Sequence, residues 1–160
     1  MASRQDLPAL TLPAGRTWRV GIARALYNES VTEAMLVEAQ RCLESYGVAC
    51  DVITVPGAFE VVYIADRMLA TGKYDGIVTL GCLIKGATIH DEVISHAVAQ
   101  GVMALQARYG KPVGFGIMNA NTMAEAEART WHGFDAAYAV LSGLAHAPSG
   151  DDQAGEGLKQ

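Results

Sequence analysis

Hydrophobic and polar positions repeat along this chain in two regular ways. Residues 29–47 place Val31, Met35 and Leu43 at a spacing near 3.6, which predicts an amphipathic helix that ends at Gly47. Short runs that are apolar throughout predict strands, because a strand covered on both faces has no polar side. We expect strands at 17–23, 49–55, 75–84 and 112–118, and helices at 29–47, 58–71, 89–109 and 133–145, with a short helix within 121–130.

The order of these elements predicts the fold class. Strands and helices alternate from residue 17 to residue 145, which indicates an α/β protein whose parallel sheet carries helices on both faces. Ligands of such sheets bind beyond the carboxyl ends of the strands. The segments 24–30, 56–60, 82–90 and 118–122 are therefore where we expect the chemistry.

Composition and charge narrow the function classes. The chain has 160 residues, of which 51% are hydrophobic, so it can form one compact domain. Its net charge of −5 and the lack of a basic block argue against nucleic acid as a partner. No apolar run reaches the roughly 20 residues that span a bilayer. We expect an extended arm over residues 1–15, a single domain over 16–146 and a flexible tail over 147–160.

Cysteine and histidine placement gives no metal pattern. The three cysteines, Cys42, Cys50 and Cys82, form no CxxC pair, and their odd number argues against a disulfide framework. His90 and His96 are six residues apart on an expected helix, so they point to different faces. We expect no metal, and reduced thiols in a cytoplasmic protein.

The first two strand-end segments carry an aromatic ring and a carboxylate. Tyr27 follows the first strand, where it either caps the sheet or offers its ring to a ligand. Asn28 is expected to cap the next helix. Glu60 lies in the first turn of the second helix, where the helix dipole favours it in any case. Its functional reading is that Glu60 and the free N–H groups of this turn bind a polyol or a heterocycle.

The segment Lys85–His90 combines small residues, a hydroxyl and an imidazole. The N–H groups of Gly86, Ala87 and Thr88 precede a helix and have no partner inside it. An anion such as phosphate is favoured there. His90 is either an ordinary surface residue or a proton carrier, since imidazoles titrate near neutral pH. Later in the chain, Phe115 could be a core residue and Arg129 could simply favour a helix end.

Taken together, these segments resemble the lumazine synthase family. The matching stretches are VPGAFE (55–60), GKYDGIVTLGCLIKGATIH (72–90) and PVGFGIMNANTMAEAEAR (112–129), with the strand and YNE segment near 21–32. The resemblance extends from about Trp18 to Leu144. It implies a flavodoxin-like, three-layer αβα sandwich with a four-stranded parallel sheet. It also implies synthesis of 6,7-dimethyl-8-ribityllumazine, the riboflavin precursor, from 5-amino-6-(D-ribitylamino)uracil and 3,4-dihydroxy-2-butanone 4-phosphate, without cofactor or metal.

The same resemblance implies roles for individual residues and an assembly. His90 would transfer protons. The pyrimidine and ribityl chain would be bound by Tyr27, Ala58, Phe59, Glu60, Cys82, Leu83 and Ile84, and by Phe115 from the adjacent subunit. The phosphate would be bound by Lys85, Gly86, Ala87, Thr88, Arg129 and His132. Family members form pentamers, decamers or 60-subunit shells with active sites between subunits, and riboflavin synthase is a candidate partner.

Three departures from the family pattern lie at the phosphate end. Lys85 stands where most members have arginine, Asp91 replaces an aromatic residue, and the segment 130–133 is shortened, with His132 in place of a basic group. Two other readings stay open at this point. The chain could be a paralogue that binds lumazines or flavins without making them, or it could serve mainly as an assembly protein.

Overall fold

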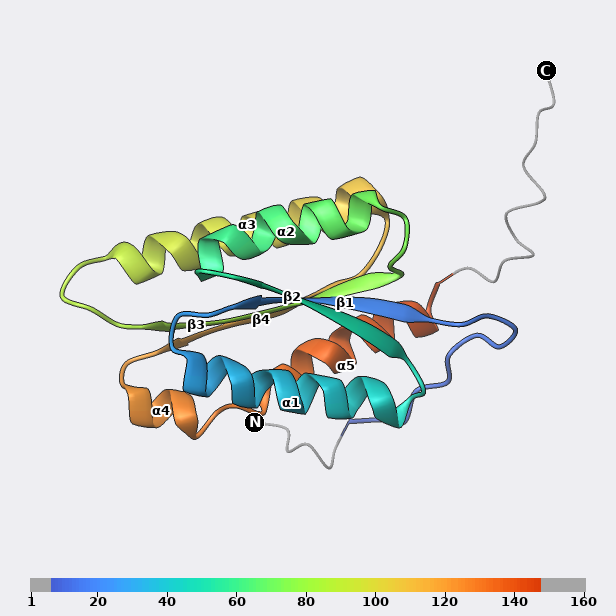
Figure 1. Cartoon of the computed structure of the whole chain (residues 1–160), viewed down its shortest axis with the longest axis horizontal. Coiled ribbons are helices and arrows are strands. Elements are labelled where there is room, and N and C mark those ends of the chain that lie inside the picture. The colour runs from blue at the N-terminus through green and yellow to red at the C-terminus, as the bar shows by residue number, and fades with distance from the viewer. Residues whose placement is uncertain (1–6, 148–160) are drawn as a thin grey trace, which may run out of the picture.

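A four-stranded parallel sheet forms the middle layer of the computed structural model, which describes residues 7–147 (Figure 1). The sheet order is β2-β1-β3-β4, and all three pairings are parallel. The α/β class and the four-stranded parallel sheet expected from the sequence are confirmed. The strands are β1 (Arg19–Ala25), β2 (Ala49–Val55), β3 (Gly76–Ile84) and β4 (Val113–Ala120).

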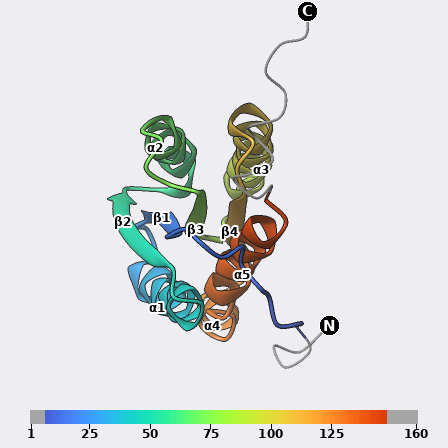
Figure 2. The ribbon, with the colours of Figure 1, turned by 90° about the vertical axis from the view of Figure 1, so that its right-hand side faces the viewer.

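Helices cover both faces of the sheet, which makes the molecule a three-layer sandwich (Figure 2). One face carries α1 (Glu29–Ser45), α4 (Met123–Glu127) and α5 (His132–Ala145), and the other carries α2 (Ala58–Ala70) and α3 (His90–Tyr109). Each helix lies within two residues of the range expected from periodicity. No helix among residues 7–147 is long and apolar enough to cross a membrane.

Alternation along the strands divides the apolar side chains between two cores. Val20 and Ile22 of β1 pack toward α1 and α5, whereas Ala23 and Ala25 pack toward α2 and α3. All four are buried, as expected for a strand covered on both faces. The sheet is thereby fixed between its helices, and its carboxyl end holds the connecting segments in place.

β1 ends two residues later than the sequence indicated. The expected strand stopped at residue 23 because Arg24 interrupts the apolar run. In the structure Arg24 continues the strand, pairs with Leu80 in register and is only 5% exposed. Its charge is matched by Glu33 on α1, whose carboxylate Oε2 lies 2.6 Å from the guanidinium Nη1. A paired arginine can therefore occupy a position that hydrophobicity alone would assign to a loop.

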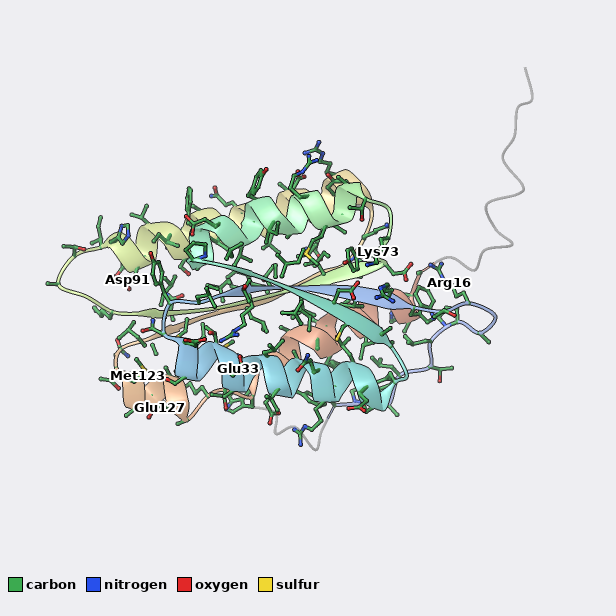
Figure 3. The ribbon with its side chains drawn as sticks, in the orientation of Figure 1. Arg16, Glu33, Lys73, Asp91, Met123 and Glu127 are labelled. Carbon is green, nitrogen blue, oxygen red and sulfur yellow. The ribbon has the colours of Figure 1, made fainter. Side chains whose placement is uncertain are left out.

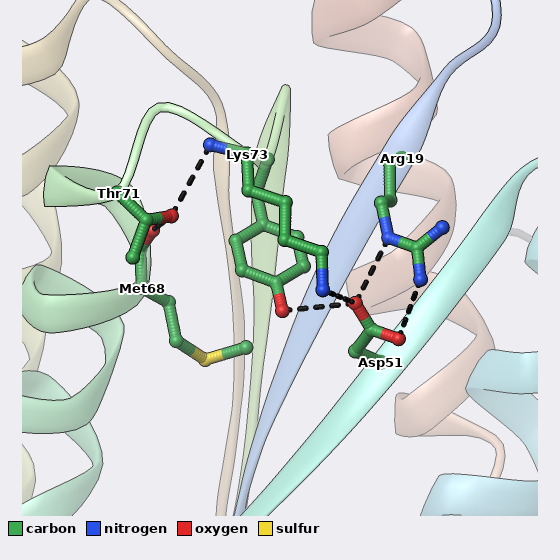
Figure 4. A network of polar contacts seen from close by, with 6 residues as sticks. Arg19, Asp51, Met68, Thr71 and Lys73 are labelled. Carbon is green, nitrogen blue, oxygen red and sulfur yellow. Dashed lines mark hydrogen bonds and ion pairs between the residues drawn. The ribbon is translucent and has the colours of Figure 1, made fainter.

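At the amino-terminal end of the sheet, charged side chains join β1, β2 and the segment before β3 (Figure 4). The Arg19 Nε and Nη2 groups donate to the two Asp51 oxygens at 2.9 and 2.7 Å. The Lys73 ammonium lies 2.8 Å from Asp51 Oδ2, and the Tyr74 hydroxyl donates to the same oxygen. These partners, Arg19 first, hold the pKa of Asp51 well below its usual value.

The described part of the amino-terminal segment lies against its own domain. Residues 7–15 form neither helix nor strand. The Tyr138 hydroxyl donates to the Pro8 carbonyl at 2.6 Å, and the Leu10 N–H donates to the Tyr46 hydroxyl at 3.3 Å. This segment therefore contacts α1 and α5. Residues 1–6 and the expected flexible tail from residue 148 onward lie outside the described residues.

Candidate active site

A cavity of about 720 Å³ opens at the carboxyl end of the sheet, where the turns after β1, β2 and β3 meet the start of α3. Asp91, at its edge, lies at the opposite end of the molecule from Arg16 and Lys73 (Figure 3). Ten of the site residues expected from the sequence line this cavity: Tyr27, Ala58, Phe59, Glu60, Cys82, Leu83, Ile84, Gly86, Thr88 and His90.

Tyr27 presents an aromatic surface to the cavity. Its backbone N–H donates to the Pro56 carbonyl at 3.0 Å, which joins the turn after β1 to the turn after β2. A Cβ added to Gly57 would lie 3.0 Å from the ring carbons of Tyr27, so the ring packs directly on the glycine backbone. The side chain nevertheless stays 68% exposed. A flat ring of a ligand can stack on such a supported aromatic surface.

Asn28 lines the cavity and was missed as a site residue by the sequence reasoning. It does occupy the N-cap position of α1, but its side chain makes no capping bond. Instead its Nδ2 donates to the Cys82 carbonyl at 2.9 Å, across 54 residues of sequence. Its φ of 58° is in the left-handed region, which asparagine tolerates better than most residues. An asparagine directly after an aromatic residue at a strand end was the available signal.

One carboxylate oxygen of Glu60 makes a structural hydrogen bond, and the other stays available to a ligand. Its Oε2 accepts from the Gly57 N–H at 3.0 Å, and its own N–H donates to the Gly57 carbonyl at 3.2 Å. The first bond is the glutamate half of a capping box at the start of α2, and the second is a backbone bond of the first helical turn. The carboxylate is exposed and lines the cavity. The other carboxylate oxygen, Oε1, can therefore accept from a ligand hydroxyl.

The end of β3 offers backbone groups to the cavity. β1 pairs with β3 only as far as Leu80, whereas β4 stays paired as far as Ile84. The edge of residues 82–84 that would face β1 is thus free of strand pairing, and such an edge carries open N–H and C=O groups, apart from the Cys82 carbonyl that accepts from Asn28. Burial raises the pKa of the Cys82 thiol to about 11. The thiol stays protonated at neutral pH, so Cys82 is not suited to act as a nucleophile.

The segment before α3 is open to solvent. Residues 85–90 are all exposed, and a Cβ added to Gly86 would meet nothing within 4 Å. The Thr88 hydroxyl accepts from the His90 N–H at 3.4 Å. His90 begins the 20-residue helix α3, whose positive dipole end therefore points at the cavity. This arrangement suits an anion bound beside an imidazole.

Lys85 does not line the cavity. Its N–H donates to the Ala120 carbonyl at 2.8 Å, and Lys85 lines a second hollow of about 290 Å³ with Asn119, Asn121 and Asp91, the last of which also lines the cavity. Ala87, which is exposed, does not line the main cavity either. Among residues 7–147 no lysine or arginine lines that cavity, whereas the carboxylates of Glu60 and Asp91 do.

Three more expected site residues lie elsewhere on this chain. Phe115 is on β4 and 44% exposed, and Arg129 is exposed just after α4. His132 begins α5, half-buried, with its ring stacked on Trp131 at 4.1 Å between centroids. Burial lowers the pKa of His132, which favours its neutral form. Arg129 and His132 come from the helical layer opposite α2 and α3 (Figure 2).

Metal-ligating side chains do not cluster in the described part of the chain. Within 7–147 no three His, Cys, Asp or Glu side chains come together in a way that could hold a metal ion. None of the three cysteines, all of which lie within residues 7–147, forms a disulfide. The side chains that line the cavity include an imidazole at His90, a carboxylate at Glu60 and an aromatic ring at Tyr27, which can respectively transfer protons, accept hydrogen bonds and stack.

Comparisons with known proteins agree on one family. The model of the family described as 6,7-dimethyl-8-ribityllumazine synthase matches residues 17–147. The chain is also similar to a protein of Synechocystis sp. (strain ATCC 27184 / PCC 6803 / Kazusa) named 6,7-dimethyl-8-ribityllumazine synthase. The two are 36% identical over 121 residues, which cover 71% of this chain and 74% of the relative.

Proposed function

The chain belongs to the 6,7-dimethyl-8-ribityllumazine synthase family, and from this we propose how its cavity performs the family's reaction. It is a transferase of riboflavin biosynthesis. The substrates are 5-amino-6-(D-ribitylamino)uracil and 3,4-dihydroxy-2-butanone 4-phosphate, and the products are the lumazine, phosphate and water. The observation that carries the proposal is the cavity that unites Tyr27, Glu60 and His90 from three separate segments.

The ring substrate takes the half of the cavity between Tyr27 and the end of β3. The pyrimidine stacks on the exposed face of Tyr27. Its polar edge pairs with those backbone groups of residues 82–84 that stay open, which leaves out the Cys82 carbonyl because that group accepts from Asn28. The ribityl hydroxyls donate to the Glu60 carboxylate, close to Ala58 and Phe59 at the start of α2. Because these groups are already held in place, little ordering is required when the substrate binds.

The phosphate substrate takes the half of the cavity beside α3. Its phosphate accepts from the N–H groups of Gly86 and Thr88, which line the cavity, and of the exposed Ala87 between them, where the helix dipole favours an anion. The uracil amine attacks the ketone carbon, and water leaves as the imine forms. His90 removes the proton from the adjacent carbon, and phosphate then departs as the enol forms. The ribityl-bearing nitrogen closes the ring onto the resulting ketone, with loss of a second water.

We propose that neighbouring subunits complete the site. The departing phosphate needs a cation, yet no lysine or arginine of residues 7–147 lines the cavity. Arg129, with His132 and Phe115, would come from the adjacent subunit. Exposed apolar side chains on α2 and α3 support such a contact: Phe59, Tyr63, Val93 and Met103 are 55–68% exposed. The assembly proposed is a homopentamer, with decamers and 60-subunit shells as larger forms.

Mixed assemblies test the shared site. In the proposed site, His90 comes from one subunit and Arg129 from the next. In a mixture of the two variants, a site is intact only where an Arg129→Ala subunit, which still has His90, is followed by a His90→Ala subunit, which still has Arg129. We expect each variant alone to be nearly inactive. When the two variants are co-expressed in equal amounts and mix at random in a closed ring, half of the subunits have an intact His90 and half have an intact Arg129. About one quarter of the sites then have both residues, so about one quarter of wild-type activity should return. No recovery in assembled mixtures would show that both residues act within one chain.

A direct assay tests the synthase function itself. The two substrates are mixed with the protein, and the lumazine chromophore is followed above the uncatalysed background. No increase in rate would refute the function and would favour a lumazine- or flavin-binding paralogue, which flavin titration would then detect. We propose a cytoplasmic location, which is supported by three cysteines that form no disulfide among residues 7–147. Riboflavin synthase, which consumes the lumazine, is the proposed partner.

A further inference from the structure

A buried arginine lies beneath the turn that carries Tyr27. Arg24 is only 5% exposed and points from β1 into the layer that holds α1. Its Nε donates to the Thr32 hydroxyl at 3.3 Å, and its Nη2 donates to the Glu29 carbonyl at 3.5 Å. Its Nη1 lies 2.6 Å from the carboxylate of Glu33, which lies on α1 below the sheet (Figure 3). A single side chain thus connects the end of β1 with the first turn of α1.

Stability does not explain why an arginine occupies this position. A buried cation loses its hydration, and an apolar side chain of similar size is often as stable in its place. The guanidinium also lies at the amino-terminal turn of α1, where the helix dipole disfavours a cation. Its acidic partners gain little from it, since the side chains of Glu29 and Glu33 are 74% and 54% exposed. Water would solvate both carboxylates without Arg24.

The position of these contacts indicates what Arg24 achieves. The contacts lie on both sides of residues 26–28. The backbone of Arg24 is fixed in the sheet before this turn, and its side chain bonds to Glu29 and Thr32 after it. Within this turn, Asn28 has the left-handed φ of 58°. Tyr27 keeps an exposed ring that packs against Gly57. A turn of this kind would otherwise open locally, since exposed turns are the least stable parts of a fold.

We propose that Arg24 is a positioning residue that holds the turn 26–28 in the conformation that presents Tyr27 to the ring substrate. The inference rests on the proposed function for its substrate. Arg24 touches no substrate and leaves the phosphate half of the cavity unaffected, because that half is lined by Gly86, Thr88 and His90. Its loss should therefore act on one substrate and not on the other.

The test replaces Arg24 by methionine, which is unbranched, apolar and adaptable in packing. In Arg24→Met we expect KM for the ribitylaminouracil to rise by roughly tenfold, since the substrate must then order the turn as it binds. KM for the phosphate ketone and the melting temperature should stay at wild-type values. Hydrogen exchange of the Leu26 and Tyr27 amides, which donate to Val55 and Pro56, should become faster.

Two matched variants separate this role from a general effect of losing an arginine. Arg41→Met makes the same change at an exposed arginine of α1 that pairs with Glu38, and it should leave both KM values unchanged. Arg24→Lys keeps the charge but lacks the fork that reaches several partners, so it should restore only part of the affinity. If Arg24→Met does not fold, Glu33→Gln weakens the same contact from its exposed side and should shift KM in the same direction.

The outcomes distinguish this inference from the proposed function. An unchanged ring KM together with unchanged exchange at residues 26 and 27 would overturn the positioning role. Equal increases in both KM values with a lower melting temperature would overturn it as well, since a purely structural residue behaves in this way. If the wild-type protein makes no lumazine, the proposed function fails, and the exchange measurement still decides whether Arg24 orders the turn.

Discussion

Glu60 has two separable functions that two substitutions can measure one at a time. One carboxylate oxygen, Oε2, accepts from the Gly57 N–H at 3.0 Å and caps α2. The other oxygen is proposed to accept from the ribityl chain. Glu60→Gln keeps one side-chain oxygen for the cap, because glutamine serves at this position of a capping box. Glu60→Ala removes both interactions.

The expected magnitudes follow from these contacts. A hydrogen bond to a charged group is worth roughly 1.5–3 kcal/mol and a neutral one roughly 0.5–1.5 kcal/mol. The difference of about 1 kcal/mol predicts that Glu60→Gln raises KM for the ribitylaminouracil by about fivefold. Loss of the cap costs about 1 kcal/mol. For a chain of this size, Glu60→Ala should then lower the melting temperature by about 3 °C, and it should raise the same KM further.

The assay varies the ribitylaminouracil at saturating phosphate ketone and follows lumazine formation, with melting curves of the same preparations. Glu125→Ala is a matched control, since Glu125 accepts from the Asn121 N–H at 3.0 Å beside the start of α4 and outside the cavity. It should lower the melting temperature without changing the ring KM. An unaltered KM in Glu60→Gln would remove the carboxylate from ribityl binding. An unaltered melting temperature in Glu60→Ala would refute the cap.

Three further predictions concern turnover, acid stability and packing. His90→Ala should lower kcat by about 10²-fold, which is the lower end of the range for general acid–base catalysis, because the substrates also react without a catalyst. A full rate in the chromophore assay would exclude the proton-transfer role. The pKa of Asp51 is lowered, chiefly by Arg19, so its stabilisation is complete above the unfolded pKa of about 3.9 and is lost as pH falls toward the folded value. Acid unfolding of Asp51→Asn should accordingly depend less on pH below about 4, and an unchanged slope would contradict this. Gly133→Ala would place a Cβ 1.9 Å from the Met35 carbonyl oxygen of α1. We expect denaturant titration to show that the free energy of unfolding falls by about 3 kcal/mol. An unchanged free energy of unfolding would mean that α5 can shift away from α1 without cost.

Much of the candidate site could be predicted because its residues lie in a few short stretches. The rule that ligands bind at strand ends selected the segments that contain Tyr27, Glu60 and His90, and these three line one cavity. The rule gives segments rather than side-chain directions. It could not indicate that Lys85 lines a second hollow, or that Asn28 bonds to Cys82 instead of capping α1.

The sequence by itself determined the elements, their order and the parallel sheet. Helices and strands differ in their side-chain period, and that period is a local property that can be read within a dozen residues. Only the tertiary structure decided that Arg24 is buried, that Asn28 bonds to Cys82, and that Phe115 and Arg129 do not line the cavity. Each of these depends on contacts between segments far apart in the chain, and the free energy of a buried charge or a strained turn is set by such partners and not by sequence neighbours.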